Sequence, residues 1–267
     1  MTPTPQFSTR EKETAWVVRF RPNPSARLRL FCIPYAGVGA SVYFPWTARI
    51  HPSVELVAIQ FPGREGRIRE EPIDRLSRLA PEAARCLLPY LDRPYALFGH
   101  SMGALVGYEV ARCLADQKVT GPVHLFVSGR RAPGRRDVLP PIHNLPDRDF
   151  VEEVSRRWNG IPQELLREKD LLDLLLPTLR ADVAVIETYD HVEGEPLACP
   201  ISVFGGTEDG TTGPEDLQSW RRHTRGAFKL SMMPGNHFFI RSQQNAILDS
   251  VVADLLPALA GGGGGTC

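Results

Sequence analysis

Short apolar segments recur along this chain, and longer stretches with helical spacing separate them. The apolar segments are rich in β-branched and aromatic residues and are continuous rather than alternating, which is typical of strands buried on both faces of a sheet. They occupy residues 27–33, 54–61, 95–99, 124–129, 201–206 and 228–233. The stretches between them include residues 76–91 and 104–117, which have the length of helices. This alternation predicts an α/β fold with a mostly parallel central sheet and helices on both of its faces.

One region interrupts the alternation. Between residues 140 and 195 no segment has the pattern of a strand, and Gly160, Pro162 and Pro177 divide the region into several expected helices. Open α/β sheets bind ligands at the carboxyl edge of their strands, and insertions of this length are often functional. We therefore expect the helices to form a lid over that edge. The alternative is that they are ordinary packing helices.

The length of 267 residues suffices for one large α/β domain or two small ones. No internal repeat is visible in the sequence. We expect a single domain over residues 1–260, which includes the lid insertion at 140–195. The remaining residues, 261–267, read GGGGGTC and are expected to form a flexible tail.

Charge and cysteine content narrow the classes of function. Lysine plus arginine equals aspartate plus glutamate, at 31 each, so the overall charge does not indicate a nucleic-acid or anionic-membrane partner. The five cysteines form no C-x-x-C pair and no metal-type spacing, which favours a reducing compartment. The sequence shows neither an apolar signal segment at its start nor an apolar run of membrane-spanning length. We therefore expect a cytoplasmic monomer that binds neither nucleic acid nor a membrane.

The segment FGHSMGA contains the candidate nucleophile, Ser101. It follows the strand-like YALF and precedes the helix-like ALVGYEVARCL, so Gly99-x-Ser101-x-Gly103 lies where a strand turns sharply into a helix. Glycines relieve crowding at such a turn, and the serine projects above the sheet. The helix N-terminus also brings backbone N–H groups close to the hydroxyl. The alternative is a glycine-flanked turn that happens to contain serine, and the other candidate residues decide between the two.

A serine hydroxyl needs an adjacent base, normally histidine, before it can attack a carbonyl group. Among the seven histidines, His237 lies in PGNHFF, on a glycine-containing loop directly after the last strand-like segment. An α/β-hydrolase carries its histidine after the acid, late in the chain, so His237 is the candidate base. His100 lies inside the serine motif and is expected to pack or hydrogen-bond locally. His223 lies in a helical segment and is expected to be exposed.

The histidine in turn needs a carboxylate that fixes its tautomer and stabilises its protonated form. In this fold the acid stands between the serine and the histidine in the chain. The loop after residues 201–206 reads TEDGTTGPEDL and offers Glu208, Asp209, Glu215 and Asp216. Asp209 follows the strand closely and is followed by glycine, which makes it the candidate acid. Asp216 fits the start of the next helix instead.

An oxyanion hole requires two N–H donors. One candidate is the N–H of Met102, directly after the serine, and the other is the N–H of Ala36 in the loop IPYAGVGASVYF. The small residues of that loop permit close backbone approach. Read as a phosphate-binding turn, the loop lacks the GK[ST] of a P-loop, and GVGAS is no dinucleotide fingerprint.

Seven motifs follow one another along the chain: PYAGVGAS, QFPGREGR, FGHSMGA, VSGRRAP, LRAD, FGGTED and PGNHFF. This ordered set resembles the type II thioesterases that accompany modular polyketide synthases and nonribosomal peptide synthetases. The resemblance runs over residues 28–256. Matched motif by motif, it implies a nucleophile, an acid, a base and two oxyanion donors at Ser101, Asp209, His237, Ala36 and Met102.

The resemblance implies an α/β-hydrolase fold with a mobile helical lid and without a cofactor, since the phosphopantetheine arm belongs to the substrate. The implied reaction is hydrolysis of stalled or misprimed acyl groups held as thioesters on the arm of acyl or peptidyl carrier domains. The segment RWNGIP departs from the glycine-rich lid segment expected for the family, which leaves the acyl preference open. The triad alone is also compatible with a carboxylesterase, an acyltransferase or, with a residue misplaced, a catalytically silent binding protein.

Two further sets of residues have two interpretations each. The first is a group of leucines in the insertion that either line a pocket for an acyl chain or belong to the core: Leu165, Leu166, Leu171, Leu172, Leu174, Leu175 and Leu176. The second is a group of arginines after residues 124–129: Arg130, Arg131, Arg135 and Arg136. These arginines either contact the phosphate of the arm or an acidic carrier domain, or form a solvated basic loop.

Overall fold

The computed structural model describes residues 15–135, 139–158, 160, 161 and 167–261. Within them, one seven-stranded sheet has the order β1-β3-β2-β4-β5-β6-β7. The strands are β1 (Val17–Val18), β2 (Leu28–Ile33), β3 (Val54–Ile59), β4 (Tyr95–His100), β5 (His124–Ser128), β6 (Ile201–Gly206) and β7 (Phe228–Met233). β1 is antiparallel to β3, and the other neighbouring strands are parallel. The predicted mostly parallel sheet is confirmed, whereas β1 is too short to give a periodic signal in the sequence.

The helices are α2 (Leu76–Leu87), α3 (Met102–Asp116), α4 (Asp147–Trp158), α6 (Lys169–Glu187), α7 (Pro214–Gln218), α8 (Phe239–Ser242) and α9 (Gln244–Gly261). Short 3₁₀ helices are η1 (Ala40–Ala48), η2 (Glu65–Arg67), η3 (Leu88–Tyr90) and η4 (Ser219–His223). In these described parts of the chain, none of the helices combines the length and the apolar character needed to cross a membrane.

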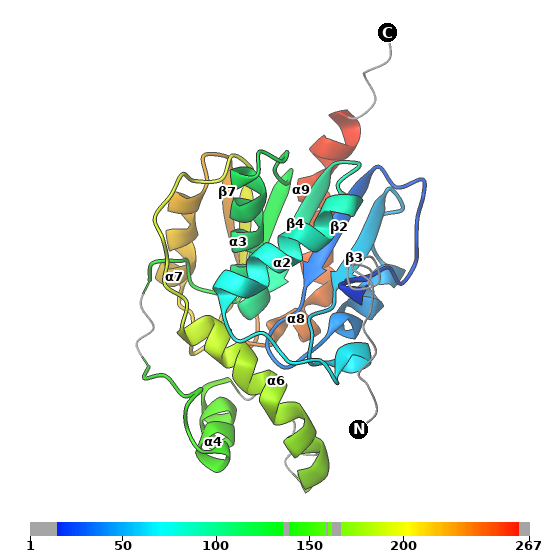
Figure 1. Cartoon of the computed structure of the whole chain (residues 1–267). Coiled ribbons are helices and arrows are strands. Elements are labelled where there is room, and N and C mark those ends of the chain that lie inside the picture. The colour runs from blue at the N-terminus through cyan, green and yellow to red at the C-terminus, as the bar shows by residue number, and fades with distance from the viewer. Residues whose placement is uncertain (1–14, 136–138, 159, 162–166, 262–267) are drawn as a thin grey trace.

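Helices cover both faces of the sheet, as Figure 1 shows. The side chain of Phe31 packs with residues of α2 and α3 in one apolar cluster. Its neighbour Leu30 lies in a second cluster with residues of η1, α8 and α9. Successive side chains of one strand thus enter different cores, which explains why the strand segments are apolar throughout. The predicted helices on both faces are confirmed.

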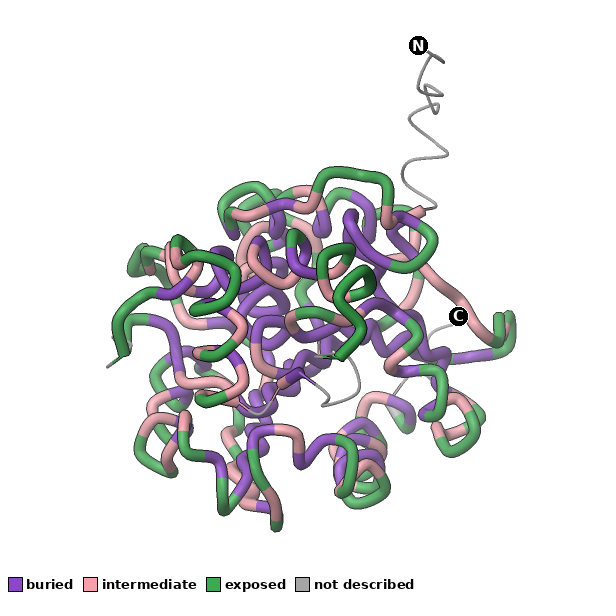
Figure 2. The backbone as a smooth tube through the Cα atoms, turned by 90° about the horizontal axis from the view of Figure 1, so that it is seen from below, coloured by how far each residue is buried: buried purple, intermediate pink, exposed green. Residues whose placement is uncertain are grey.

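The helical insertion, residues 140–195, contains α4 and α6, which lie together at the bottom of Figure 1. The two helices share a third apolar cluster of Ile142, Phe150, Val154, Ile161, Leu176 and Val183. Near its end α6 also enters the main core through Val185 and Ile186. Seen from this side, buried segments concentrate in the middle of the molecule and exposed ones form its periphery (Figure 2).

The leucines of the insertion differ in their surroundings. Leu176 is buried in the third cluster, and Leu172 packs against it. Leu171 and Leu174, near the start of α6, are exposed. The predicted positions Leu165 and Leu166, like Pro162, lie outside the described residues. For the described leucines, the structure therefore favours core and surface positions over the lining of one pocket.

Candidate active site

Ser101 occupies a sharp turn between β4 and α3. Its backbone has φ 51° and ψ −117°, a conformation that costs energy for a residue other than glycine and is found at functional sites. Its N–H donates to the carbonyl oxygen of Ser128 at 2.7 Å, which fixes the turn to the neighbouring strand. A Cβ atom on Gly103 would lie 2.2 Å from the carbonyl oxygen of Ile33, and one on Gly99 would lie 2.1 Å from that of Gly103. Only glycine fits at both positions.

Three side chains form a continuous hydrogen-bonded chain at the carboxyl edge of the sheet. The Nε2 atom of His237 lies 3.0 Å from Oγ of Ser101, and its Nδ1 atom lies 2.8 Å from Oδ2 of Asp209. The serine follows β4, the aspartate follows β6 and the histidine follows β7, so parallel strands bring residues 136 positions apart into contact. The proton on Nδ1 is donated to the carboxylate, which leaves Nε2 free to accept from the serine hydroxyl.

The Asp209 carboxylate is also held by two threonines. Thr211 donates to Oδ1 from both its N–H and its hydroxyl, at 2.9 and 2.7 Å, and the Thr212 hydroxyl donates to Oδ2 at 2.7 Å. Burial alone would raise the pKa of Asp209, but the hydrogen bond and charge of His237, with the threonine hydrogen bonds, hold the pKa below the ordinary value. The carboxylate therefore stays ionised. The sequence signal for these threonine contacts is the segment D-G-T-T, because hydroxyl residues shortly after aspartate form local turns.

The loop after β2 contains a type II turn beside the serine. The N–H of Val38 donates to the carbonyl oxygen of Tyr35 at 3.4 Å, and Gly37 has φ 79°, the left-handed value that the third position of such a turn requires. Ala36 is the second residue of the turn. Because Ile33 pairs with Gly99 across the sheet, this loop and the serine turn leave adjacent strands at the same edge. Met102, the first residue of α3, follows Ser101 directly.

His100 is fully buried beneath this site. Its Nδ1 atom lies 2.9 Å from Oγ of Ser128, and its ring stands 5.2 Å from that of His237. Burial, followed by repulsion from His237, lowers the pKa of His100 well below the ordinary value, so the ring is neutral. The prediction that His100 packs and hydrogen-bonds locally is confirmed.

The prediction that His223 is exposed is wrong. Its side chain contacts the hydroxyl of Tyr108 at 3.1 Å through Nδ1 and the carbonyl oxygen of Pro133 at 3.2 Å through Nε2, and only 5% of its surface is exposed. The segment forms the short η4 rather than a surface helix, and its Trp220 and His223 face inward. Burial, followed by the neighbouring His191, lowers the pKa of His223 to about 4.

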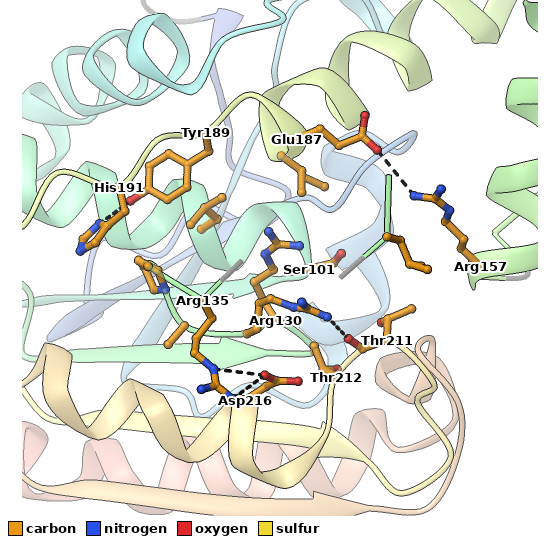
Figure 3. A pocket seen from close by; sticks show the side chains of 18 of the residues that line it. Ser101, Arg130, Arg135, Arg157, Glu187, Tyr189, His191, Thr211, Thr212 and Asp216 are labelled. Atoms are coloured by element: carbon orange, nitrogen blue, oxygen red, sulfur yellow. Dashed lines mark hydrogen bonds and ion pairs between the residues drawn. The ribbon is translucent and has the colours of Figure 1, made fainter. Parts of the chain in front are cut away.

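A cavity of about 880 Å³ opens beside Ser101 and His237. Residues of the helical insertion line one side of it, and the segments that follow β5 and β6 line the other. Figure 3 shows labelled side chains from both sides around Ser101: Arg130, Arg135, Arg157, Glu187, Tyr189, His191, Thr211, Thr212 and Asp216. The leucine set of the insertion contributes none of its described members to this lining.

The arginines after β5 make contacts at this cavity. Arg131 donates to the carbonyl oxygen of Thr211 at 2.5 Å, and Arg135 forms an ion pair with Asp216 at 3.2 Å. Asp216 lies in the first turn of α7, where the sequence predicted the start of a helix. Arg136 lies outside the described residues. In the described ranges, no group of three or more His, Cys, Asp or Glu side chains is placed to hold a metal ion.

A family model and several known proteins match nearly the whole of this chain. Residues 28–255 match the family model of the thioesterase domain. The gramicidin S biosynthesis protein GrsT of Aneurinibacillus migulanus is 40% identical over 245 residues, which cover 92% of this chain and 95% of GrsT. The RedJ thioesterase structure from the prodiginine pathway of Streptomyces coelicolor has a TM-score of 0.82 and 39% identity, covering 88% of this chain and 92% of RedJ. The type II thioesterase BorB of the borrelidin cluster has the same TM-score and 34% identity, covering 90% and 98%.

Proposed function

This chain belongs to the thioesterase family, and from that premise we propose that Ser101, Asp209 and His237 are its catalytic triad. The chain is a hydrolase that acts on thioesters. The observation that carries the residue assignment is the unbroken hydrogen-bonded path from the hydroxyl through the imidazole to the carboxylate, at 3.0 and 2.8 Å. The proposed mechanism needs only these side chains, backbone N–H groups and water, so it requires no cofactor.

In the first half-reaction His237 takes the hydroxyl proton through Nε2 while the Ser101 oxygen attacks the thioester carbonyl. The ionised Asp209 stabilises the imidazolium that forms. The C–S bond then breaks, the sulfur leaves as a thiol with the proton from His237, and the acyl group stays on the serine. In the second half-reaction water gives its proton to the same nitrogen and attacks the acyl-serine, which releases the carboxylic acid and restores the hydroxyl.

We propose the N–H groups of Ala36 and Met102 as the donors that stabilise the oxyanion of each tetrahedral intermediate. Met102 begins α3, where the first N–H groups of a helix have no intrahelical acceptor. Ala36 lies in a turn whose next N–H, that of Gly37, is already engaged by a carboxylate of α6. Such preorganised donors contribute about 100- to 1,000-fold each in kcat.

We propose that the substrate is an acyl group on the phosphopantetheine arm of an acyl or peptidyl carrier domain of a polyketide synthase or nonribosomal peptide synthetase. The names of the relatives support this substrate, since they come from gramicidin S, prodiginine and borrelidin biosynthesis and two of them are called thioesterases. Those names do not favour the carboxylesterase, acyltransferase and silent-binder alternatives. In this role the enzyme clears stalled or misprimed units.

We propose that the helical insertion acts as a lid within a single domain of residues 1–260. Arg157 of α4 and Glu187 at the end of α6 line the cavity beside Ser101, so a shift of either helix changes access to the nucleophile. A contact between the arginines after β5 and the phosphate of the arm also stays a prediction. We further propose a cytoplasmic location, because the described cysteines are unpaired thiols, and we keep the monomer as a prediction.

The test is release of acetyl or propionyl groups from a phosphopantetheinylated carrier domain, followed by intact-protein mass spectrometry. The substitution Ser101→Ala should lower release at least about 1,000-fold without loss of folding, because triad residues act as a unit. The matched control is Ser77→Ala, at an exposed serine on α2, which should release acyl groups at the wild-type rate.

Matched oxygen esters of the same acids separate the substrate classes. Serine-dependent carrier release with slow ester turnover supports the proposal. Rapid ester turnover with slow carrier release would support the triad but show that the proposed substrate class is wrong. Retained activity in Ser101→Ala would show that Ser101 is not the nucleophile.

A further inference from the structure

A buried ion pair joins the helical insertion to the loop after β3. Arg64 and Asp182 of α6 are 4% and 0% exposed, so both charges are removed from water. The guanidinium meets the carboxylate with two parallel hydrogen bonds, Nη1 to Oδ2 at 2.7 Å and Nη2 to Oδ1 at 2.8 Å. A bidentate pair of this kind is directional as well as strong, and it fixes the position of α6 relative to the loop.

The same pair holds the turn that contains Ala36. Oδ2 of Asp182 accepts the N–H of Gly37 at 2.8 Å, and Nη1 of Arg64 donates to the carbonyl oxygen of Val38 at 3.3 Å. These two hydrogen bonds bind the N–H of the third residue of the type II turn and the carbonyl oxygen of the fourth. The carboxylate therefore restrains the peptide that follows Ala36, and with it the orientation of the whole turn.

Two neighbours of Asp182 on α6 pack against the same loops. A Cβ atom on Gly37 would lie 3.0 Å from Cδ1 of Leu179, so the helix is already at contact distance from the turn. The hydroxyl of Thr178 donates to the carbonyl oxygen of Gly63, one residue before Arg64. One face of α6 thus rests on the turn after β2 and on the loop after β3 together.

We propose that Asp182 is a positioning residue for the oxyanion hole. By accepting the Gly37 N–H it sets the plane of the turn so that the Ala36 N–H meets the developing oxyanion, and by pairing with Arg64 it makes that setting depend on the position of α6. This inference rests on the proposed function, because it assigns a role within that active site. It explains why a helix outside the sheet carries a buried carboxylate that is remote in sequence from the triad.

The test is the substitution Asp182→Asn, with hydrolysis of a propionyl N-acetylcysteamine thioester as the assay. The amide is isosteric but cannot hold the Arg64 fork and the Gly37 N–H together, so we expect kcat to fall about 10- to 100-fold, somewhat less than for a deleted oxyanion donor. KM should stay within about threefold, because the turn acts on the transition state rather than on ground-state binding. The affinity for a propyl trifluoromethyl ketone, which forms a tetrahedral adduct with the serine, should fall by the same factor as kcat/KM.

Two further variants separate positioning from folding. Arg64→Met with Asp182→Leu removes both buried charges and fills the space with apolar side chains, a change that proteins often tolerate. It leaves the Gly37 N–H without its acceptor, so kcat should stay low even where the melting temperature is restored. The control is Glu55→Gln, which breaks the buried pair with Arg29 on β2 and β3. It should lower stability and leave kcat unchanged.

The proposal is overturned if folded Asp182→Asn keeps kcat and ketone affinity within about threefold of the wild type. It is also overturned if the apolar double variant regains wild-type kcat, or if both variants fail to fold, since the pair would then serve stability alone. Failure of the proposed function looks different: wild-type enzyme would not hydrolyse the thioester, or Ser101→Ala would retain activity, whatever Asp182 does.

Discussion

The serine turn and the helical insertion above it are held by different forces. The turn is fixed by contacts between backbone atoms, such as the 2.7 Å hydrogen bond from Ser101 to Ser128 and the close passage of Gly103 over Ile33. The insertion has a small apolar cluster of its own and is joined to the body through the end of α6 and through the buried Arg64–Asp182 pair.

This difference divides the chemistry between the two regions. A nucleophile that is fixed by sheet geometry cannot move without disrupting the core, so its position is a property of the fold. The cavity walls and the turn of Ala36 depend on α6, which has few contacts with the sheet. We therefore expect the serine to be equally placed in all states of the protein, while access to the cavity and oxyanion stabilisation vary with the insertion.

The largest difference between the two regions should appear when a fully buried phenylalanine is replaced in each of them. These residues are Phe31 in the sheet and Phe150 in the insertion. Phe31→Ala leaves a cavity in the main core and should lower the free energy of global unfolding by about 4 kcal/mol. Phe150→Ala affects the third cluster only and should change global unfolding by less than about 1 kcal/mol, because the insertion opens locally before the body unfolds.

Urea denaturation followed by tryptophan fluorescence measures the free energy of global unfolding for both variants. Hydrogen exchange should show the loss in Phe150→Ala confined to α4 and the start of α6. If this variant instead shifted the global midpoint as far as Phe31→Ala does, the two regions would form one cooperative unit and the division proposed above would be wrong.

A second prediction concerns the crowding at the serine turn. Gly103→Ala places a Cβ atom 2.2 Å from a backbone oxygen of β2, which cannot move aside as a side chain can. We expect about 3 kcal/mol of lost stability, together with loss of activity from a displaced Ser101. Gly66→Ala is the control, since nothing lies within 4 Å of its added carbon. Thermal melts that show equal stability for the two variants would mean that the turn relaxes.

The parts of the site that could be predicted from the sequence are those with a local signal. Ser101 stands in a five-residue motif between an apolar segment and a helix, and the order of the later motifs placed Asp209 and His237 after their strands. The parallel sheet follows from the continuous apolar segments. In each case the signal that allows the prediction lies within a few residues of one position in the sequence.

The remaining features depend on contacts between distant segments. Asp182 and Arg64 stand in the motifs LRAD and QFPGREGR, but they are 118 residues apart, and neither motif shows that the two side chains pair. The inward face of η4, which buries His223, depends on Tyr108 of α3 and on the loop at Pro133. A strand of two residues such as β1 is too short to show a periodic pattern of apolar residues in the sequence. These features require the assembled fold, because only the fold brings the partners together.

The smallest expected effect is a loss of global stability at low pH that arises from histidines in the body. His124 in β5 and His223 in η4 are buried in the body, where burial lowers the pKa of each to about 4. Above about pH 6.5 the imidazoles are neutral in both the folded and the unfolded chain. Below that pH the unfolded chain binds protons that the folded chain does not, so stability is lost as pH falls from 6.5 towards 4. Between pH 7 and pH 5 each histidine should cost about 2 kcal/mol of global stability.

Urea midpoints at the two pH values, for the wild type and His124→Gln, measure this loss directly. The variant removes one titrating group, so its loss between pH 7 and pH 5 should be about 2 kcal/mol smaller than that of the wild type, whatever its stability at pH 7. The Phe150→Ala variant should show the full wild-type loss, because the third cluster contains neither histidine, and the insertion contacts His223 through His191, which lies beyond the end of α6. A loss that shrank in Phe150→Ala would mean that α4 and α6 help to keep these histidines buried, and that the two regions are coupled more tightly than their contacts indicate.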